Sequence, residues 1–142
     1  MTLTVWPLAE RFRLEIASID TAATSLLSSP PTLDGQRTVG AQAIAIANAH
    51  GLDEPPEITD FVVDLLHADS LLDKPSWHFS RGEKQMAGLI LAFARPFEWL
   101  VLIDPTAGLD GQRVAALAHF LSDYGQDYDL DIATDIEIFN PR

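Results

Sequence analysis

The sequence predicts an α/β fold, and two neighbouring runs between Trp77 and Asp110 carry that prediction. Trp99 to Ile103 is a continuous apolar run that ends on Asp104, which is typical of a buried strand reaching the carboxyl edge of an open α/β sheet. Before it, the Ser/Gly turn from Phe79 to Gln85 leads into the apolar stretch Met86 to Ala94 and predicts a helix. A helix start leaves backbone N–H groups unpaired at the positive end of the dipole, so this turn is a candidate phosphate site.

The first third of the chain predicts three short strands. Thr2 to Trp6 alternates apolar and polar residues and stops at Pro7. Phe12 to Ile16 alternates more cleanly and is the stronger strand prediction of the two. Thr24 to Leu27 is a candidate third strand, which ends at the turn-forming run Ser28 to Pro31.

Helices are expected through the rest of the chain. Val39 to His50 is alanine-rich and predicts a helix, and the following Gly51 suits its C-terminal cap. Pro56 to Leu66 carries apolar residues at helical spacing, and Gln112 to Tyr124 has one apolar helical face. The last predicted strand, Leu130 to Thr134, ends on Asp135.

The composition bounds the class of protein. The 142 residues, 47% of them apolar, suffice for one compact core and not for two ordinary domains. The chain has no cysteine, which excludes disulfides and cysteine-ligated metal. Its formal net charge of −12 argues against binding a nucleic-acid backbone, which requires clustered Lys and Arg. No apolar run is long enough to span a bilayer and no signal-peptide pattern opens the chain, so we expect a cytoplasmic protein that reaches a membrane only through a partner.

The two central runs resemble the second half of an ATP-binding-cassette (ABC) ATPase domain. Phe79 to Gln85 is similar to the signature motif, Leu-Ser-Gly-Gly-Gln and its variants. Trp99 to Asp104 resembles the Walker B strand, and Ala107 to Asp110 resembles the D-loop that follows it. The resemblance covers about Ser29 to Phe139, and the order of the motifs, with one helix between the first two, makes it specific.

The resemblance implies a partial P-loop-NTPase-like fold in a single domain over residues 1–142. Its parts would be a small parallel sheet, a helical subdomain inserted at residues 38–75, and a region at residues 76–142 with the signature, Walker B-like strand, D-loop and C-terminal strand. The first strand, the P-loop and the P-loop helix of a complete cassette are expected to be missing, because they would lie before the matched part.

Several residues on which ATP hydrolysis depends in this family are absent. No Gly-x-x-x-x-Gly-Lys-Ser/Thr run occurs, so the Walker A P-loop that cradles phosphates is not encoded. Ser29 falls where the Q-loop glutamine would stand, and Asp135 replaces the switch histidine that contacts the γ-phosphate. We therefore expect a degenerate ATPase that holds neither nucleotide nor metal in cis.

Asp104 is the candidate catalytic residue, and two alignments are open for it. Without a gap it occupies the catalytic glutamate position, and Ile103 replaces the metal-organising aspartate. With a one-residue deletion it is the Walker B aspartate, and the glutamate is missing. In either alignment only one of the two carboxylates, the metal-organising aspartate or the catalytic glutamate, is present. Hydrolysis of ATP by this chain alone is therefore not expected.

Ser80, Arg81, Gly82 and Glu83 are the candidate nucleotide-binding residues. In the family the signature motif crosses a dimer interface and closes over ATP held by the partner's P-loop, so the ATP and magnesium would belong to the partner. Locally the same run predicts a capping box, with Ser80 as N-cap and Glu83 three residues later, and both roles can hold at once. A side chain at Gly82 is expected to leave the fold intact, because the site lies at an exposed helix start.

Two further sets of residues are candidates for a function, one as a D-loop and one as calcium ligands. Gly108, Leu109 and Asp110 match the D-loop, which packs at the cassette dimer interface, although Asp110 equally fits a helix cap. Asp127, Asp129 and Asp131 alternate as calcium ligands do, but the central glycine and terminal glutamate of a calcium loop are missing. We expect these three aspartates to form a solvated acidic edge, and we expect no metal site.

The sequence thus predicts a non-catalytic ABC ATPase-like accessory subunit. Its partner would be another ABC ATPase subunit, a membrane transporter component, or a second copy of this chain. An alternative is a stand-alone interaction or structural protein that has kept the fold and no longer binds nucleotide. A third is a transporter ATPase that is active only with a partner chain.

Overall fold

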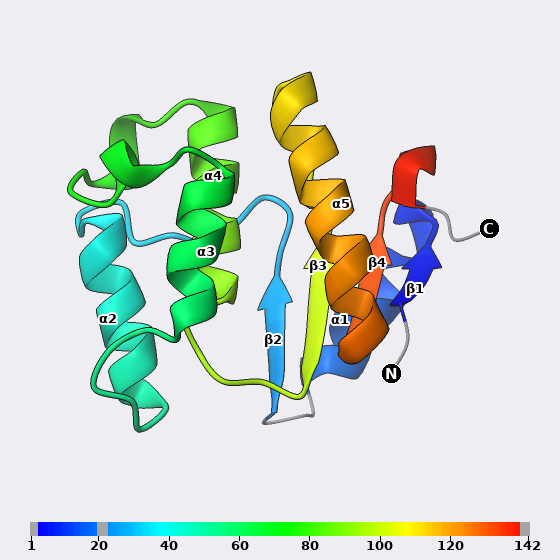
Figure 1. Ribbon diagram of the computed structural model, residues 1–142, viewed down its shortest axis with the longest axis horizontal. Coiled ribbons are helices and arrows are strands. Elements are labelled where there is room, and N and C mark those ends of the chain that lie inside the picture. Colours follow the sequence, from blue (N-terminus) through cyan, green and yellow to red (C-terminus); the bar gives the residue numbers. More distant parts are fainter. Residues whose placement is uncertain (1–2, 20–22, 140–142) are drawn as a thin grey trace.

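A computed structural model describes residues 3–19 and 23–139 of the chain (Figure 1). Four strands form one sheet in the order β1-β4-β3-β2, and every neighbouring pair is parallel. The strands are β1 (Leu3–Trp6), β2 (Thr24–Leu27), β3 (Trp99–Ile103) and β4 (Asp129–Ala133). The predicted α/β class with a small parallel sheet is therefore confirmed.

Helices cover both faces of this sheet and extend beyond one of its edges. Within the described residues the α-helices are α1 (Arg11–Ile19), α2 (Val39–Ala49), α3 (Glu57–Leu65), α4 (Arg81–Ala92) and α5 (Gly111–Asp127). Short 3-10 turns occupy Leu8–Glu10, Asp69–Leu71, Ser76–His78 and Glu137–Phe139. Figure 1 shows α5 in front of the sheet and α1 behind it, while α2, α3 and α4 stand together beside β2. No helix in this described part is both long and apolar enough to cross a membrane.

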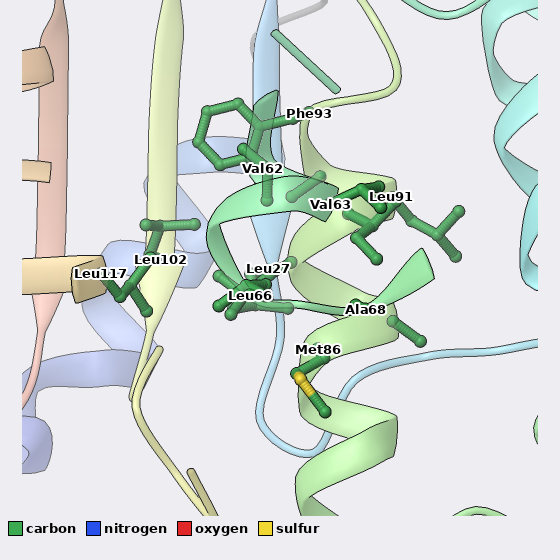
Figure 2. Packing of buried hydrophobic residues seen from close by; sticks show 14 of the residues in the cluster. Leu27, Val62, Val63, Leu66, Ala68, Met86, Leu91, Phe93, Leu102 and Leu117 are labelled. Carbon is green, nitrogen blue, oxygen red and sulfur yellow. The ribbon is translucent and has the colours of Figure 1, made fainter. Parts of the chain in front are cut away.

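The strands alternate their side chains between two apolar layers. On β3, Leu100 and Leu102 join the large core beneath α4 and α5, whereas Val101 and Ile103 belong to the smaller cluster beneath α1. Figure 2 shows the large core, in which side chains from α3, α4, α5, β2 and β3 come together. Because both faces of β3 are covered, its sequence is continuously apolar instead of alternating.

Helix α4 is buried around nearly its whole circumference. Every residue from Gln85 to Ala92 is buried, since α4 lies between β2 on one side and α2 and α3 on the other. Gly88 allows the close approach: a Cβ at this position would lie 2.6 Å from the Pro31 Cβ and 2.9 Å from the Leu27 Cδ1. At the helix end, the Ser25 Oγ donates a hydrogen bond to the Ala92 carbonyl at 2.6 Å.

Residues 38–75, expected to form a helical subdomain, begin and end at the same place. Thr38 and Pro75 form an isolated antiparallel bridge, and α2 and α3 lie between them in the chain. The Thr38 Oγ1 accepts a hydrogen bond from the Ala41 N–H at 3.1 Å and so caps α2. Gly51, with a φ of +82°, follows the end of α2, which confirms the predicted C-terminal glycine.

The prediction of a strand over Phe12 to Ile16 is wrong, because these residues lie in α1. The apolar alternation that suggested a strand does not mark one buried face. Leu14 is 4% exposed and packs beneath the sheet, whereas Phe12 and Ile16 are 61% and 66% exposed. Alternation over a short run is a weak signal when two of its three apolar residues face solvent.

The first residues of the chain add a strand and a helix to the fold. The strand β1, predicted from Thr2 to Trp6, pairs with β4 from Leu3↔Leu130 to Trp6↔Ala133, and α1 follows it. Gly125 of α5 lets β1 lie close beneath that helix, because a Cβ on it would meet the Leu3 Cβ at 2.7 Å. The partner of β1 lies near the far end of the chain, which no local pattern reveals.

Candidate functional site

The signature-like turn opens α4 with the capping box that the local sequence predicts. The Ser80 Oγ accepts from the Glu83 N–H at 3.2 Å, and the Glu83 Oε1 accepts from the Ser80 N–H at 3.0 Å. The backbone hydrogen bond from Ser80 is the main cause that lowers the pKa of the Glu83 carboxyl, and Lys74 and His78 lower it further. The box occupies the N–H groups of Ser80 and Glu83 and does not use those of Arg81 and Gly82.

The D-loop-like turn lies directly against this helix start. A Cβ on Gly82 would lie 2.7 Å from the Gly108 carbonyl oxygen, so the two backbones pack together. Gly108 has a φ of +75°, which favours glycine, and a Cβ there would lie 3.3 Å from the Gly82 nitrogen. The expectation that a side chain at Gly82 leaves the fold intact is therefore wrong, because it would collide with backbone.

Asp110 is the N-cap of α5. Its Oδ1 accepts from the Arg113 N–H at 2.9 Å, and its Oδ2 accepts from the Arg113 Nη1. The backbone hydrogen bond from Arg113 is the main cause that lowers the pKa of the Asp110 carboxyl. Arg113 also donates through Nε to the Leu66 carbonyl at 2.7 Å, which ties the start of α5 to the end of α3. The helix-cap role open for Asp110 in the sequence is thus present in the structure.

The structure gathers most of the predicted binding residues around one pocket of about 330 Å³. Ser80, Gly82 and Glu83 come from the α4 start, and Gly108, Leu109 and Asp110 come from the D-loop-like turn. His67 and Arg113 also line it. Two motifs that are separate in the sequence therefore form one continuous surface at the carboxyl edge of the sheet.

Arg81 faces a second pocket, of about 460 Å³, on the other side of the α4 start. Lys84 and Gln85 line it with Arg81, and Ser29, at the expected Q-loop position, lies across from them. The chain has 9 Lys and Arg residues against 21 Asp and Glu residues, and Arg81 and Lys84 place two of these cations on one helical turn, with Glu83 between them in sequence. Such a pair provides the local positive potential that an anion requires on an acidic protein.

Gln85 is the functional residue that sequence reasoning left without a separate role. It is 2% exposed, and its Nε2 donates to the carbonyls of Asp104 and Pro105 at 3.2 and 2.8 Å. These bonds join the first turn of α4 to the end of β3. The available signal was an amide directly before the apolar run that starts at Met86, since a buried polar side chain needs partners.

Asp104 stands at the end of β3 in a strained backbone conformation. Its φ is +47°, unusual for a residue other than glycine, and its N–H donates to the Ala133 carbonyl at 2.7 Å. Among residues 3–19 and 23–139, no cation or hydrogen-bond donor contacts its carboxylate. The carboxylate is half-buried and lies at the same sheet edge as Asp135.

Asp135 binds the backbone between β1 and α1. Its Oδ1 accepts from the Leu8 N–H at 3.0 Å, at the start of the 3-10 turn that leads into α1. Next to it, the Thr134 N–H donates to the Trp6 carbonyl at 2.9 Å. The carboxylate therefore occupies a backbone donor at a helix start, which is the kind of group that binds phosphate in other proteins.

The three alternating aspartates separate into two environments. Asp127 and Asp129 are exposed, as expected for a solvated edge. Asp131 contradicts that expectation, because it is partly buried and accepts from the indole N–H groups of Trp6 and Trp99 at 2.7 and 3.1 Å. No group of three or more potential metal ligands occurs in the part of the chain that the structure describes.

Solved structures share this fold at low sequence identity. An ATP-binding subunit of an ABC transporter matches over 95% of this chain and 68% of its own, with a TM-score of 0.78 and 15% identity. A putative metal-chelate type ABC transporter in an inward-facing conformation matches over 94% and 61%, with a TM-score of 0.67 and 15% identity. The RNase-L inhibitor matches over 97% and 30%, with a TM-score of 0.75 and 13% identity. The chain therefore has the ABC ATPase fold.

One curated protein adds a relation in sequence. The energy-coupling factor transporter ATP-binding protein EcfA of Methanoculleus marisnigri is 33% identical over 84 residues, which are 58% of this chain and 30% of that protein. The chain thus spans less than a third of the length of this curated relative. No family model matches the chain.

Proposed function

We propose that this chain is a non-catalytic ABC ATPase-like accessory subunit, which presents its signature-like turn to nucleotide held by a complete ATP-binding partner. The observation that carries the proposal is the pairing of Gly82 with Gly108. It joins the α4 start and the D-loop-like turn into one surface without needing a ligand. In the connection between β1 and α1, in contrast, the carboxylate of Asp135 already occupies the Leu8 N–H.

The cis side of this proposal rests on the β1–α1 connection. In a P-loop protein the phosphate loop joins a strand to the next helix through a glycine-rich run with a lysine. Here Pro7 to Glu10 make that connection without a glycine or a lysine. The carboxylates of Asp104 and Asp135 stand at the same sheet edge and would repel a polyphosphate.

The trans side rests on the α4 start. The N–H groups of Arg81 and Gly82 are not used by the capping box, and they lie at the positive end of a helix of twelve residues. Arg81 and Lys84 add two cations beside them. The ATP and magnesium would be held by the partner, which would be a complete ABC ATPase subunit, a transporter component or a second copy of this chain.

A stand-alone interaction protein is the second candidate, and the local roles of the motif residues favour it. Ser80, Glu83 and Asp110 each have a complete set of capping partners inside this chain. A fold that had lost all contact with nucleotide would still need these three residues. The two candidates differ in whether association with a partner responds to nucleotide.

The deciding experiment is affinity capture from native lysate, with and without non-hydrolysable ATP, followed by quantification of captured ABC ATPase subunits and transporter components. The accessory role predicts stronger capture when the analogue is present. Arg81→Glu should remove this nucleotide-dependent part, because it places a carboxylate beside the phosphate. Arg13→Glu makes the same charge change on the exposed face of α1 and serves as the control.

Equal capture of one partner by wild type and Arg81→Glu, with and without the analogue, would favour the stand-alone interaction protein. Capture of neither an ATPase subunit nor a transporter component would have the same meaning. Thermal unfolding of both variants checks that the substitutions leave the fold unchanged.

A further inference from the structure

An apolar pocket lies at the edge of the sheet opposite the signature-like turn. It has a volume of about 520 Å³ and is lined by Leu52, Pro56, Ile58, Phe97, Tyr124 and Tyr128, which together we call the tyrosine pocket. Phe97 lies two residues before β3 and Tyr128 immediately precedes β4, so the pocket stands at the amino ends of these strands. It shares no lining residue with the two pockets at the α4 start.

The aromatic wall of the tyrosine pocket is anchored in the core. Fully buried Phe93 meets Tyr124 edge to face, with ring centroids 5.8 Å apart. Tyr124 then stacks on Tyr128 at 4.4 Å, with 18° between the ring planes. Tyr128 remains 50% exposed, so the series ends in an aromatic surface that is held in place and open to solvent. Burial raises the pKa of the Tyr124 hydroxyl to about 12, which keeps this wall uncharged.

One carboxylate lines the tyrosine pocket, and four more are adjacent in sequence to residues that line it. Glu54 is the carboxylate in the lining. Four exposed carboxylates are each next in sequence to a lining residue: Asp53, Glu57, Glu98 and Asp127. The pocket also contains Arg95, whose Nε donates to the Pro96 carbonyl at 3.3 Å and whose pKa is lowered by burial. Glu54 and Arg95 balance each other in the lining itself, and the four exposed carboxylates next to lining residues make the surrounding charge negative, which favours a cationic occupant.

We propose that the tyrosine pocket binds a short cationic segment of a partner protein, with an arginine stacked over Tyr128 and apolar neighbours against Pro56 and Phe97. A guanidinium stacks well on aromatic faces and can bond to carboxylates at the same time. The rim supplies those carboxylates. A lipid headgroup or a nucleic-acid phosphate carries the charge that this rim repels.

A second copy of this chain is a poor occupant for the same reason. Two such pockets placed face to face would bring like charges together, on chains that each carry a formal net charge of −12. The proposal does not depend on the accessory role at the α4 start. Failure of one leaves the other standing.

The test is titration of the isotope-labelled protein, followed by NMR chemical shifts, with an acetylated and amidated Pro-Arg-Leu-Pro-Arg peptide. A peptide with citrulline in place of both arginines is its uncharged control. We expect saturable shifts at Ile58, Phe97 and Tyr128 with the arginine peptide, and binding weakened by added salt. The citrulline peptide should bind about tenfold more weakly, a difference equivalent to about 1.4 kcal/mol.

Variants of the tyrosine pocket sharpen this test. Tyr128→Ala should weaken binding of the arginine peptide about tenfold, whereas Tyr128→Phe keeps the ring and should stay within about threefold of wild type. Glu54→Gln should also weaken binding, and Asp64→Gln on α3, an exposed carboxylate that does not line the pocket, should not.

Several outcomes would overturn the proposal. They are the absence of saturable shifts up to about 5 mM peptide, equal binding of the citrulline peptide, and shifts confined to other surfaces. Sedimentation that shows self-association abolished by Tyr128→Ala would assign the pocket to a second copy and would also overturn it. Thermal unfolding of each variant separates loss of binding from loss of fold.

Discussion

At the scale of single residues, the site depends on positions where a side chain does not fit. Gly82 and Gly108 approach so closely that a Cβ on the first would overlap the carbonyl of the second. Gly111, also at the start of a helix, has open space around its missing Cβ. The contrast between Gly82 and Gly111 provides a matched pair in two similar local settings.

Gly82→Ala should therefore lower the free energy of unfolding by about 1–3 kcal/mol, because the new methyl must displace backbone. Gly111→Ala should change it little, or raise it by about 0.5–1 kcal/mol through the reduced entropy of the unfolded chain. Urea denaturation of the two variants measures both values. Equal stability of both variants would contradict the Gly82–Gly108 contact.

Two capping carboxylates predict a dependence of stability on pH. Hydrogen bonds from Ser80 and Arg113 lower the folded-state pKa values of Glu83 and Asp110 below their ordinary values of 4.5 and 3.8. Folding then favours the ionised forms, so this stabilisation is present above the ordinary values and is lost as the pH falls through the lowered ones. Both groups are exposed, so the contribution should be small.

The melting temperature should accordingly fall as the pH is lowered below about 4.5. In Asp110→Asn the fall should be shallower, because one of the two linked groups has been removed. Asp73→Asn, at an exposed residue, serves as the control and should follow wild type. Identical pH profiles for Asp110→Asn and wild type would contradict the linkage at Asp110.

At the scale of elements, α1 shows how one face of a helix decides which residues matter. Leu14 packs against Val101 and Ile103 beneath the sheet, whereas Phe12 and Ile16 point to solvent. Helix α4 is the opposite case after its first turn, since every position from Gln85 to Ala92 is part of the core. The two helices therefore tolerate substitution very differently.

Leu14→Ala should lower the free energy of unfolding by about 2–4 kcal/mol, the usual cost of deleting a buried leucine side chain. Ile16→Ala should cost about 0.5 kcal/mol or less, because that side chain is largely exposed. Denaturant unfolding of the two variants compares them directly. Similar losses at both positions would instead support a strand with one buried face over Phe12 to Ile16.

At the scale of the whole molecule, charge is distributed unevenly across the two candidate binding surfaces. The carboxyl edge of the sheet carries Asp104 and Asp135, and the α4 start beside it carries Arg81 and Lys84. The opposite edge carries the tyrosine pocket with its carboxylate rim. On a chain with a formal net charge of −12, we expect these local differences to favour an anionic ligand at the α4 start and a cationic one at the tyrosine pocket.

The isolated protein should not bind Mg-ATP with a dissociation constant below about 100 μM, near −5.5 kcal/mol. The physical reason is that the β1–α1 connection offers neither glycine-rich loop nor lysine, and that Asp135 already occupies the Leu8 N–H. Calorimetry with millimolar Mg-ATP measures this, and Asp104→Asn should leave the heats unchanged. Saturable Mg-ATP binding in that range, or ATP turnover that Asp104→Asn abolishes, would contradict the non-catalytic proposal.

The sequence by itself determined the elements whose signals are local. The buried run Trp99 to Ile103, the capping box at Ser80 and the glycine at the end of α2 each depend on residues within a few positions of one another. Caps and continuous burial leave such patterns because they arise from neighbouring backbone groups and side chains. These predictions correspond to observed elements.

Only the tertiary structure decided which distant segments meet. In the structure β1 pairs with β4, and the alternating run at Phe12 belongs to a half-exposed helix. Asp131 accepts hydrogen bonds from two indoles. The tertiary structure also brought Gly82 against Gly108 and Asp135 onto the Leu8 N–H. The pairings among them join residues far apart in the chain, and they arise from close packing or hydrogen bonds that exist only once the sheet has assembled.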